Sequence, residues 1–193
     1  WSEKQWEVLD GLKVNGAGSG HFEYRIPWPA DLDAGAVASV RFVAELGAKE
    51  CFDKDCDPEG TLDDNYLLGG GTHSPSRNPN AYPMTDETRH PSAVRIRVNG
   101  ATAGVVELPD DPADHRGILS WHSQLRDRRL REAGSYGYLV DVAIPAEAVA
   151  RAAEEGVFVL RLEVDAALPG GLAIYGERFG RYPLDPTLVY VLR

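Results

Sequence analysis

A run of acidic side chains between residues 53 and 64 has the spacing of a calcium-binding loop. Oxygen-bearing side chains occupy the first, third, fifth, seventh, ninth and twelfth positions of the run. Calcium takes six to eight oxygen ligands, and alternate residues of a tight loop can supply them. Pro58 and Asp64 stand where a helix–loop–helix calcium loop has glycine and glutamate, so the run is not that motif. We expect a different structural Ca²⁺ site or a solvated acidic turn, with these candidate ligands: Asp53, Asp55, Asp57, Glu59 and Asp64.

Two cysteines lie beside this acidic run. Cys51 and Cys56 are five positions apart, so a disulfide between them requires a sharp backbone turn, and two free thiols are the alternative. A disulfide would narrow the turn and could preorganise a calcium site. It would also favour an extracellular or periplasmic setting, because cytosolic thiols are kept reduced.

Aromatic and planar polar side chains in two other stretches have the chemistry of a sugar-binding site. An aromatic ring packs against the C–H face of a pyranose, and planar charged groups form paired hydrogen bonds with neighbouring hydroxyls. We expect the loops that carry them to meet at one end of the fold. Burial in the core is the alternative for Trp121. The candidate sugar-binding residues are Tyr82, Asp86, Arg89, His90, His115, Arg116, Trp121 and His122.

Several other chemistries find no support in the sequence. The five histidines include no HxH or HExxH pair, which argues against zinc. The glycines of residues 16–20 lack the strand-before, helix-after context of a dinucleotide loop, and no GxSxG nucleophile elbow occurs. Adjacent acidic pairs such as Asp110 and Asp111 face different directions in either a strand or a helix, so they predict no glycosidase dyad.

Length and charge limit the kinds of partner. The chain has 193 residues, 43% of them hydrophobic, which suits one globular domain. No apolar run approaches the roughly 18–20 residues of a membrane-spanning helix. The formal net charge of −10 argues against nucleic acid, because binding to phosphates depends on Lys and Arg. We expect no nucleic-acid partner and no membrane partner.

The elements that would position these residues are mostly strands. Glycine and proline divide the chain into short runs in which apolar residues alternate, and Asn99-Gly100 is a strong hairpin signal. We therefore expect an all-β fold, an antiparallel β-sandwich. The expected strands cover residues 22–26, 40–46, 94–98, 105–108, 138–144, 158–164, 172–175 and 188–192.

The remaining segments are one helix, one long loop and the N-terminal residues. Pro145 at the first helical position and Gly156 at the end predict a short helix over 146–155. Residues 49–92 show almost no periodicity and predict a long irregular loop, either functional or a surface insertion. We expect 1–13 to be a linker or N-terminal segment and 14–193 to form the sandwich.

The turns and strand ends of the chain resemble a known kind of domain. The resemblance lies in residues 18–27, 44–46, 78–86, 108–117 and 180–186, within a region of similarity covering most of 14–192. These residues look like the C-terminal jelly-roll domain, of galactose-binding-like type, of glycoside hydrolase family 2 enzymes. The resemblance implies a sandwich that often carries structural calcium. It also implies that the catalytic glutamates belong to a barrel that this chain is too short to contain.

The resemblance implies a non-catalytic carbohydrate-binding module, excised from a secreted or lysosomal-type hydrolase. Its partners would be a polysaccharide or oligosaccharide and the catalytic domain of the parent glycosidase. One alternative is a structural accessory domain without a ligand site of its own. Another is a jelly-roll polysaccharide lyase, in which Tyr82, His90 and His122 would transfer protons and Arg89 would neutralise a uronate.

Overall fold

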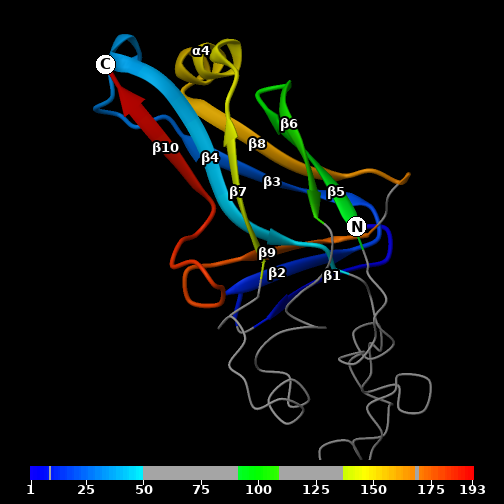
Figure 1. The fold of residues 1–193 in the computed structure, drawn as a ribbon. Coiled ribbons are helices and arrows are strands. Elements are labelled where there is room, and N and C mark those ends of the chain that lie inside the picture. The colour runs from blue at the N-terminus through cyan, green and yellow to red at the C-terminus, as the bar shows by residue number, and fades with distance from the viewer. Residues whose placement is uncertain (9, 50–90, 109–136, 168–169) are drawn as a thin grey trace, which may run out of the picture.

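The computed structural model describes residues 1–8, 10–49, 91–108, 137–167 and 170–193 (Figure 1). The acidic run, both cysteines and all eight candidate sugar-binding residues lie outside these ranges. The expected long loop lies almost entirely outside them as well.

The described residues form two antiparallel sheets that pack face to face (Figure 1). This confirms the expected all-β sandwich with one short helix. The first sheet has six strands: β1 (Lys4–Val8), β2 (Lys13–Ala17), β9 (Leu172–Tyr175), β4 (Val37–Gly47), β10 (Thr187–Leu192) and β7 (Tyr138–Ala143). The second has four strands in the order β3 (Gly20–Pro27), β8 (Val157–Val164), β5 (Ser92–Val98) and β6 (Ala101–Leu108).

Strand β4 organises the six-stranded sheet because it pairs along both edges. One edge pairs with β10 at residues 37–43 and with β9 at residues 45–47. The other edge pairs with β7, where Leu46 lies opposite Tyr138. Strands β9 and β10 therefore follow one another along the same edge of β4, and residues 176–186 connect them.

The core lies between the sheets and follows the alternation of the sequence. Phe42 and Leu46 of β4 are fully buried, as are Ile96 of β5 and Leu160 and Leu162 of β8. Successive side chains of a strand point to opposite faces, so each run of alternating apolar residues supplies one inner face. Every strand expected from that alternation is present.

Helix α4 (Ala146–Glu155) connects β7 to β8 and covers one end of the sandwich (Figure 1). Gly156 ends it with a φ of 69°, as its position predicted. Pro145 is the N-cap residue of the helix and not its first helical residue. At the same end, the Trp28 ring stacks on Phe158 at 5.5 Å, and its Nε1 donates a hydrogen bond to the Leu32 carbonyl oxygen at 2.9 Å.

Two strands had no counterpart among our expectations. Strand β1 pairs with β2, and β2 pairs with β9, so both belong to the six-stranded sheet. Strand β1 falls within residues 1–13, which we expected to form a linker or N-terminal segment. Trp1 also packs onto the fold, with its ring centroid 5.0 Å from that of Phe22.

Candidate functional site

The residues that flank the two longest stretches outside the described structure, 50–90 and 109–136, lie together at one end of the sandwich. We call this the loop end: residues 16–20, 46–49, 91–92, 108, 137–138 and 164–172, as far as they are described. The register places them together, because Leu46 lies opposite Tyr138, Ser92 lies opposite Leu108, and Val164 pairs with both Gly20 and Val94.

The residues that flank 50–90 are fixed to the same turn. The Lys49 amide donates a hydrogen bond to the Gly170 carbonyl oxygen at 2.9 Å. A Cβ atom on Gly170 would lie 1.9 Å from the Pro91 carbonyl oxygen, and one on Gly171 would lie 2.0 Å from the Lys49 carbonyl oxygen. Only glycine allows backbones to approach this closely. Lys49 and Pro91 therefore both pack against the Gly170-Gly171 turn.

The residues that flank 109–136 lie at the same end. Leu108 is the last residue of β6, is fully buried and pairs with Ser92, the first residue of β5. Gly137 precedes β7 and packs against β4, since a Cβ atom there would lie 2.9 Å from the Leu46 carbonyl oxygen. All four flanks are thus held at the loop end by strand pairing or by glycine contacts.

The described base of the loop end contains buried polar atoms that make no hydrogen bond. These atoms are Trp1 Nε1, Asn15 Oδ1 and Ser92 Oγ. Asn15 is 1% exposed and lies between Trp6 and Ala173 in the register. A buried polar atom without a partner costs free energy, so such atoms are uncommon in folded proteins. Among the described residues, these three polar atoms therefore have no hydrogen-bonding partner.

Cationic side chains surround the aromatic ring of Trp6 on the outer face of the six-stranded sheet. Lys4 Nζ lies 5.5 Å from the ring centroid and Lys49 Nζ lies 5.6 Å from it. Both distances are within the range of a cation–π interaction. Lys49 is only 2% exposed, so this contact fixes a buried charge beside the loop end.

A row of buried polar residues crosses the same face one step further along the strands. Lys13 lies opposite Tyr175, and Tyr175 lies opposite Glu45. Lys13 Nζ is 4.6 Å from the Tyr175 ring centroid. Glu45 is fully buried and accepts hydrogen bonds from the backbone amides of Arg181 at 3.0 Å and Tyr182 at 2.9 Å. The carboxylate therefore holds the 176–186 connection against the sheet.

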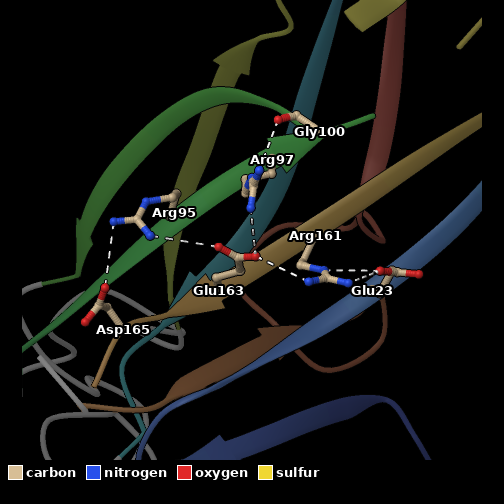
Figure 2. Close-up of polar contacts among 7 residues, drawn as sticks. All are labelled: Glu23, Arg95, Arg97, Gly100, Arg161, Glu163 and Asp165. Atoms are coloured by element: carbon tan, nitrogen blue, oxygen red, sulfur yellow. Dashed lines mark hydrogen bonds and ion pairs between the residues drawn. The ribbon is translucent and has the colours of Figure 1, made fainter. Parts of the chain in front are cut away.

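The outer face of the four-stranded sheet carries a ladder of ion pairs (Figure 2). Arg161 binds Glu23 with a closest distance of 2.7 Å and also approaches Glu163 at 3.6 Å. Glu163 further contacts Arg97 at 3.7 Å and Arg95 at 4.0 Å. The hydrogen bond from Arg161, reinforced by its charge, lowers the pKa of Glu23.

This ladder has charges but lacks the flat apolar surface that a sugar ring needs. The register places no Trp, Tyr or Phe among the described residues of this face. The arginines and carboxylates are paired with one another, and exposed ion pairs of this kind add little to stability. We assign the ladder a structural role.

The structure describes none of the thirteen candidate site residues, because all of them lie in residues 50–90 and 109–136. Among the described residues, no group of three or more His, Cys, Asp or Glu side chains could hold a metal ion. In the same part of the chain, no helix is long and apolar enough to cross a membrane. The calcium and carbohydrate assignments therefore stay predictions.

Sequence reasoning did not single out Asn15, Lys13 or Lys49. Buried charged and amide side chains look like ordinary surface residues in a sequence, because hydropathy alone does not reveal what covers them.

Comparison with known proteins gives no relative: no family model, no curated protein and no solved structure matches this chain.

Proposed function

We propose that this chain is a non-catalytic carbohydrate-binding module of galactose-binding-like jelly-roll type, which holds a parent glycoside hydrolase on a polysaccharide. The observation that carries the proposal is the meeting of four chain ends at the loop end. Lys49, Pro91, Leu108 and Gly137 flank the two stretches that contain every candidate sugar-binding residue. Residues from both stretches can form one binding site only if the flanks of the two stretches lie close together, as these four residues do.

The chemistry of the two stretches suits a neutral or weakly charged sugar. Tyr82 and Trp121 offer aromatic faces, and Asp86, Arg89 and Arg116 offer planar groups for hydroxyl pairs. A weak site of this kind acts through effective concentration, because it keeps the linked catalytic domain close to its polymer. The function fits a secreted or extracellular protein.

A structural calcium ion is part of the proposal, with Asp53, Asp55, Asp57, Glu59 and Asp64 as candidate ligands. A ligand that binds only the folded state stabilises it by mass action, by about 2.7 kcal/mol at a hundredfold excess over Kd. We expect the melting temperature to rise in calcium and fall in excess chelator. An Asp55→Asn, Asp57→Asn variant should lose this response, and a wild-type melting temperature that ignores calcium contradicts the site.

The experiment that tests the function is a binding screen of the intact chain. The protein is applied to a glycan array and to insoluble polysaccharides, in calcium and again in excess chelator. The proposal expects binding to a defined class of glycan, with loss in chelator if calcium orders the site. Absence of binding in both buffers contradicts it.

One observation favours a second candidate, a structural accessory domain of a glycosidase. Strand β10 exposes three apolar side chains: Val189 is 41% exposed, Val191 44% and Leu192 57%. Neighbouring exposed apolar residues are typical of surfaces that pack against another domain. This candidate predicts no glycan binding and a measurable affinity for the parent's catalytic domain. Changing Val189 and Val191 to Thr should weaken that affinity.

A further inference from the structure

A pocket opens into the sandwich on the side where β9 ends and β10 begins. Its volume is about 370 Å³, and its walls come from Gly11, Leu12 and Val14, from β3, from residues 174–176 and from Asp185 and Pro186. The β3 residues in its wall, Tyr24 and Ile26, lie four and six positions beyond Gly20. At about 3.3 Å per strand residue, these two side chains are some 13–20 Å along β3 from Gly20 of the loop end.

The pocket lies where β9 gives way to β10 along one edge of β4. Strand β9 stops at Tyr175 and β10 starts at Thr187, and residues 176–186 between them form turns. The Gly176 amide donates a hydrogen bond to the Leu12 carbonyl oxygen at 2.8 Å, which joins the connection to the start of β2. Asp185 Oδ1 accepts a hydrogen bond from the Glu177 amide at 3.0 Å and closes the loop.

The apolar walls of the pocket remain partly open to solvent. Val14, Tyr24 and Ile26 point toward the core, yet each is only half-buried. Side chains that face the inside of a sandwich are normally covered by the opposite sheet. Here the six-stranded sheet does not cover them fully, so a ligand could cover apolar surface that the fold itself leaves exposed.

Two polar groups at this apolar surface have unused hydrogen-bonding capacity. In the part of the chain that the structure describes, the Tyr24 hydroxyl makes no hydrogen bond, and the only side-chain bond of Asp185 is the one from the Glu177 amide to Oδ1. A carboxylate can accept several hydrogen bonds, and a phenol can both donate and accept one. The pocket thus combines an aromatic ring, aliphatic walls and two oxygen atoms available to a ligand.

The lining residues and the volume of the pocket limit the charge and the size of the ligand that it can bind. No Lys, Arg or His is found among the pocket's described lining residues, so an anionic ligand would meet only the Asp185 carboxylate. The volume is at the lower end of the range for small-molecule sites, which suits one ring better than a chain of rings. A neutral pyranose has an apolar face for the walls and hydroxyls for the two oxygen atoms.

We propose that the pocket between β2, β3 and the 176–186 connection binds a single neutral monosaccharide residue, with Tyr24 and Asp185 as its hydroxyl-binding groups. The inference goes beyond the proposed function, because the pocket is separate from the loop end and uses none of the residues assigned there. A second sugar site would let one module contact two points of a branched polymer or two neighbouring chains.

The test is a titration of the isotopically labelled chain with the methyl glycosides of glucose, galactose and mannose, followed by amide NMR. At least one glycoside should shift the amides of Gly11, Ile174 and Gly176, with a Kd on the order of 1 mM. Tyr24→Phe should weaken binding about fivefold and Asp185→Asn about tenfold. Tyr190→Phe on β10 and Asp165→Asn beyond β8 are matched controls that should leave the Kd unchanged.

The outcomes separate this inference from the proposed function. Absence of shifts at the pocket amides, at glycoside concentrations roughly tenfold above the expected Kd, overturns the pocket even if polysaccharides bind at the loop end. Pocket shifts in a chain that retains no polysaccharide support the inference and contradict the proposed function. Preferential binding of glucuronate or glucosamine over the neutral glycosides overturns the assigned ligand class.

Discussion

Glu45 shows how one residue fixes residues 176–186, the segment between β9 and β10 that forms part of the pocket wall, to the six-stranded sheet. Its side chain is fully buried, and its two carboxylate oxygens accept hydrogen bonds from the backbone amides of Arg181 and Tyr182. Gly180 completes this contact, since a Cβ atom there would lie 2.4 Å from Glu45 Oε2. The partners are 136 and 137 positions away in the sequence, so the burial of Glu45 depends on tertiary structure.

Replacing Glu45 with Gln tests this role. The amide group can accept only one of the two backbone hydrogen bonds, and its NH₂ group would face the other donor. We expect Glu45→Gln to lower the free energy of unfolding by about 1–3 kcal/mol. Urea denaturation measures the change. Glu107→Gln, at an exposed position of β6, should change stability by less than about 0.5 kcal/mol, and an equal effect of both variants would contradict the account.

Sequence reasoning at this scale identified the face of each residue but not its surroundings. Alternation correctly placed Glu45 on the face of β4 opposite the core residues Ala44 and Leu46. It could not reveal that Tyr175 and residues 176–186 cover that face, because no local pattern encodes a contact between distant segments. The thirteen predicted ligand and sugar-binding residues remain predictions for a different reason, since they lie outside the described residues.

At the scale of elements, the β5–β6 hairpin and helix α4 are joined by the turn residue Asn99. Asn99 has a φ of 44°, and its Nδ2 donates hydrogen bonds to Glu155 Oε2 at 2.9 Å and to the Val157 carbonyl oxygen at 3.0 Å. Its Oδ1 accepts a hydrogen bond from the Val159 amide at 3.1 Å. The asparagine that signals a hairpin in the sequence therefore also fixes the end of the helix and the start of β8.

We expect Asn99→Ala to lower the free energy of unfolding by about 2–3 kcal/mol, because three hydrogen bonds are lost and alanine disfavours the positive φ. Asn99→Gly separates the two causes, since glycine accepts that backbone conformation. Most of the loss should persist in the glycine variant. Thermal and chemical denaturation of both variants measure it, and a glycine variant as stable as the wild type would contradict the hydrogen-bonding role.

The ion-pair ladder of the four-stranded sheet predicts a pH dependence. The hydrogen bond from Arg161 lowers the pKa of Glu23 below its ordinary value of 4.5. A carboxyl group with a lowered folded-state pKa stabilises the fold above its unfolded pKa, and this contribution disappears as pH falls through the folded value. We expect the melting temperature of Glu23→Gln to lie below that of the wild type at pH 6.

Below pH 4.5 the difference between Glu23→Gln and the wild type should shrink toward zero, because the wild-type carboxyl then becomes protonated. Melting temperatures measured between pH 6 and pH 3 test this. Glu107→Gln, which removes an exposed carboxylate on the same sheet, serves as the control variant. A gap between Glu23→Gln and the wild type that stays constant with pH would contradict the assignment.

Most elements could be predicted from the sequence, and the exceptions have a common physical cause. The expected strands alternate because one face meets the core and the other meets water. Strand β2 does not alternate in this way, since Lys13 and Asn15 are buried on its outer face while Val14 faces the core. Strand β1 pairs only with β2 among the described strands, so its sequence carries an equally weak signal.

At the scale of the whole molecule, the sandwich carries the two regions to which we assign ligands in the proposals above. The loop end collects the four flanks of the stretches that carry the candidate sugar-binding residues. The pocket beside β3 lies on a different part of the sandwich. The formal net charge of −10 disfavours polyanions at either region, so neutral polysaccharides are the expected partners.

The central claim is that the two stretches whose flanks meet at the loop end bind carbohydrate. The most direct test measures the Kd for the best-retained polysaccharide with wild type, Trp121→Ala and His122→Ala, using His21→Ala on the exposed face of β3 as the matched control. We predict at least roughly tenfold weaker binding for Trp121→Ala, a clear loss for His122→Ala and no change for His21→Ala, with unchanged melting temperatures. Equal affinities across all four proteins would contradict the account.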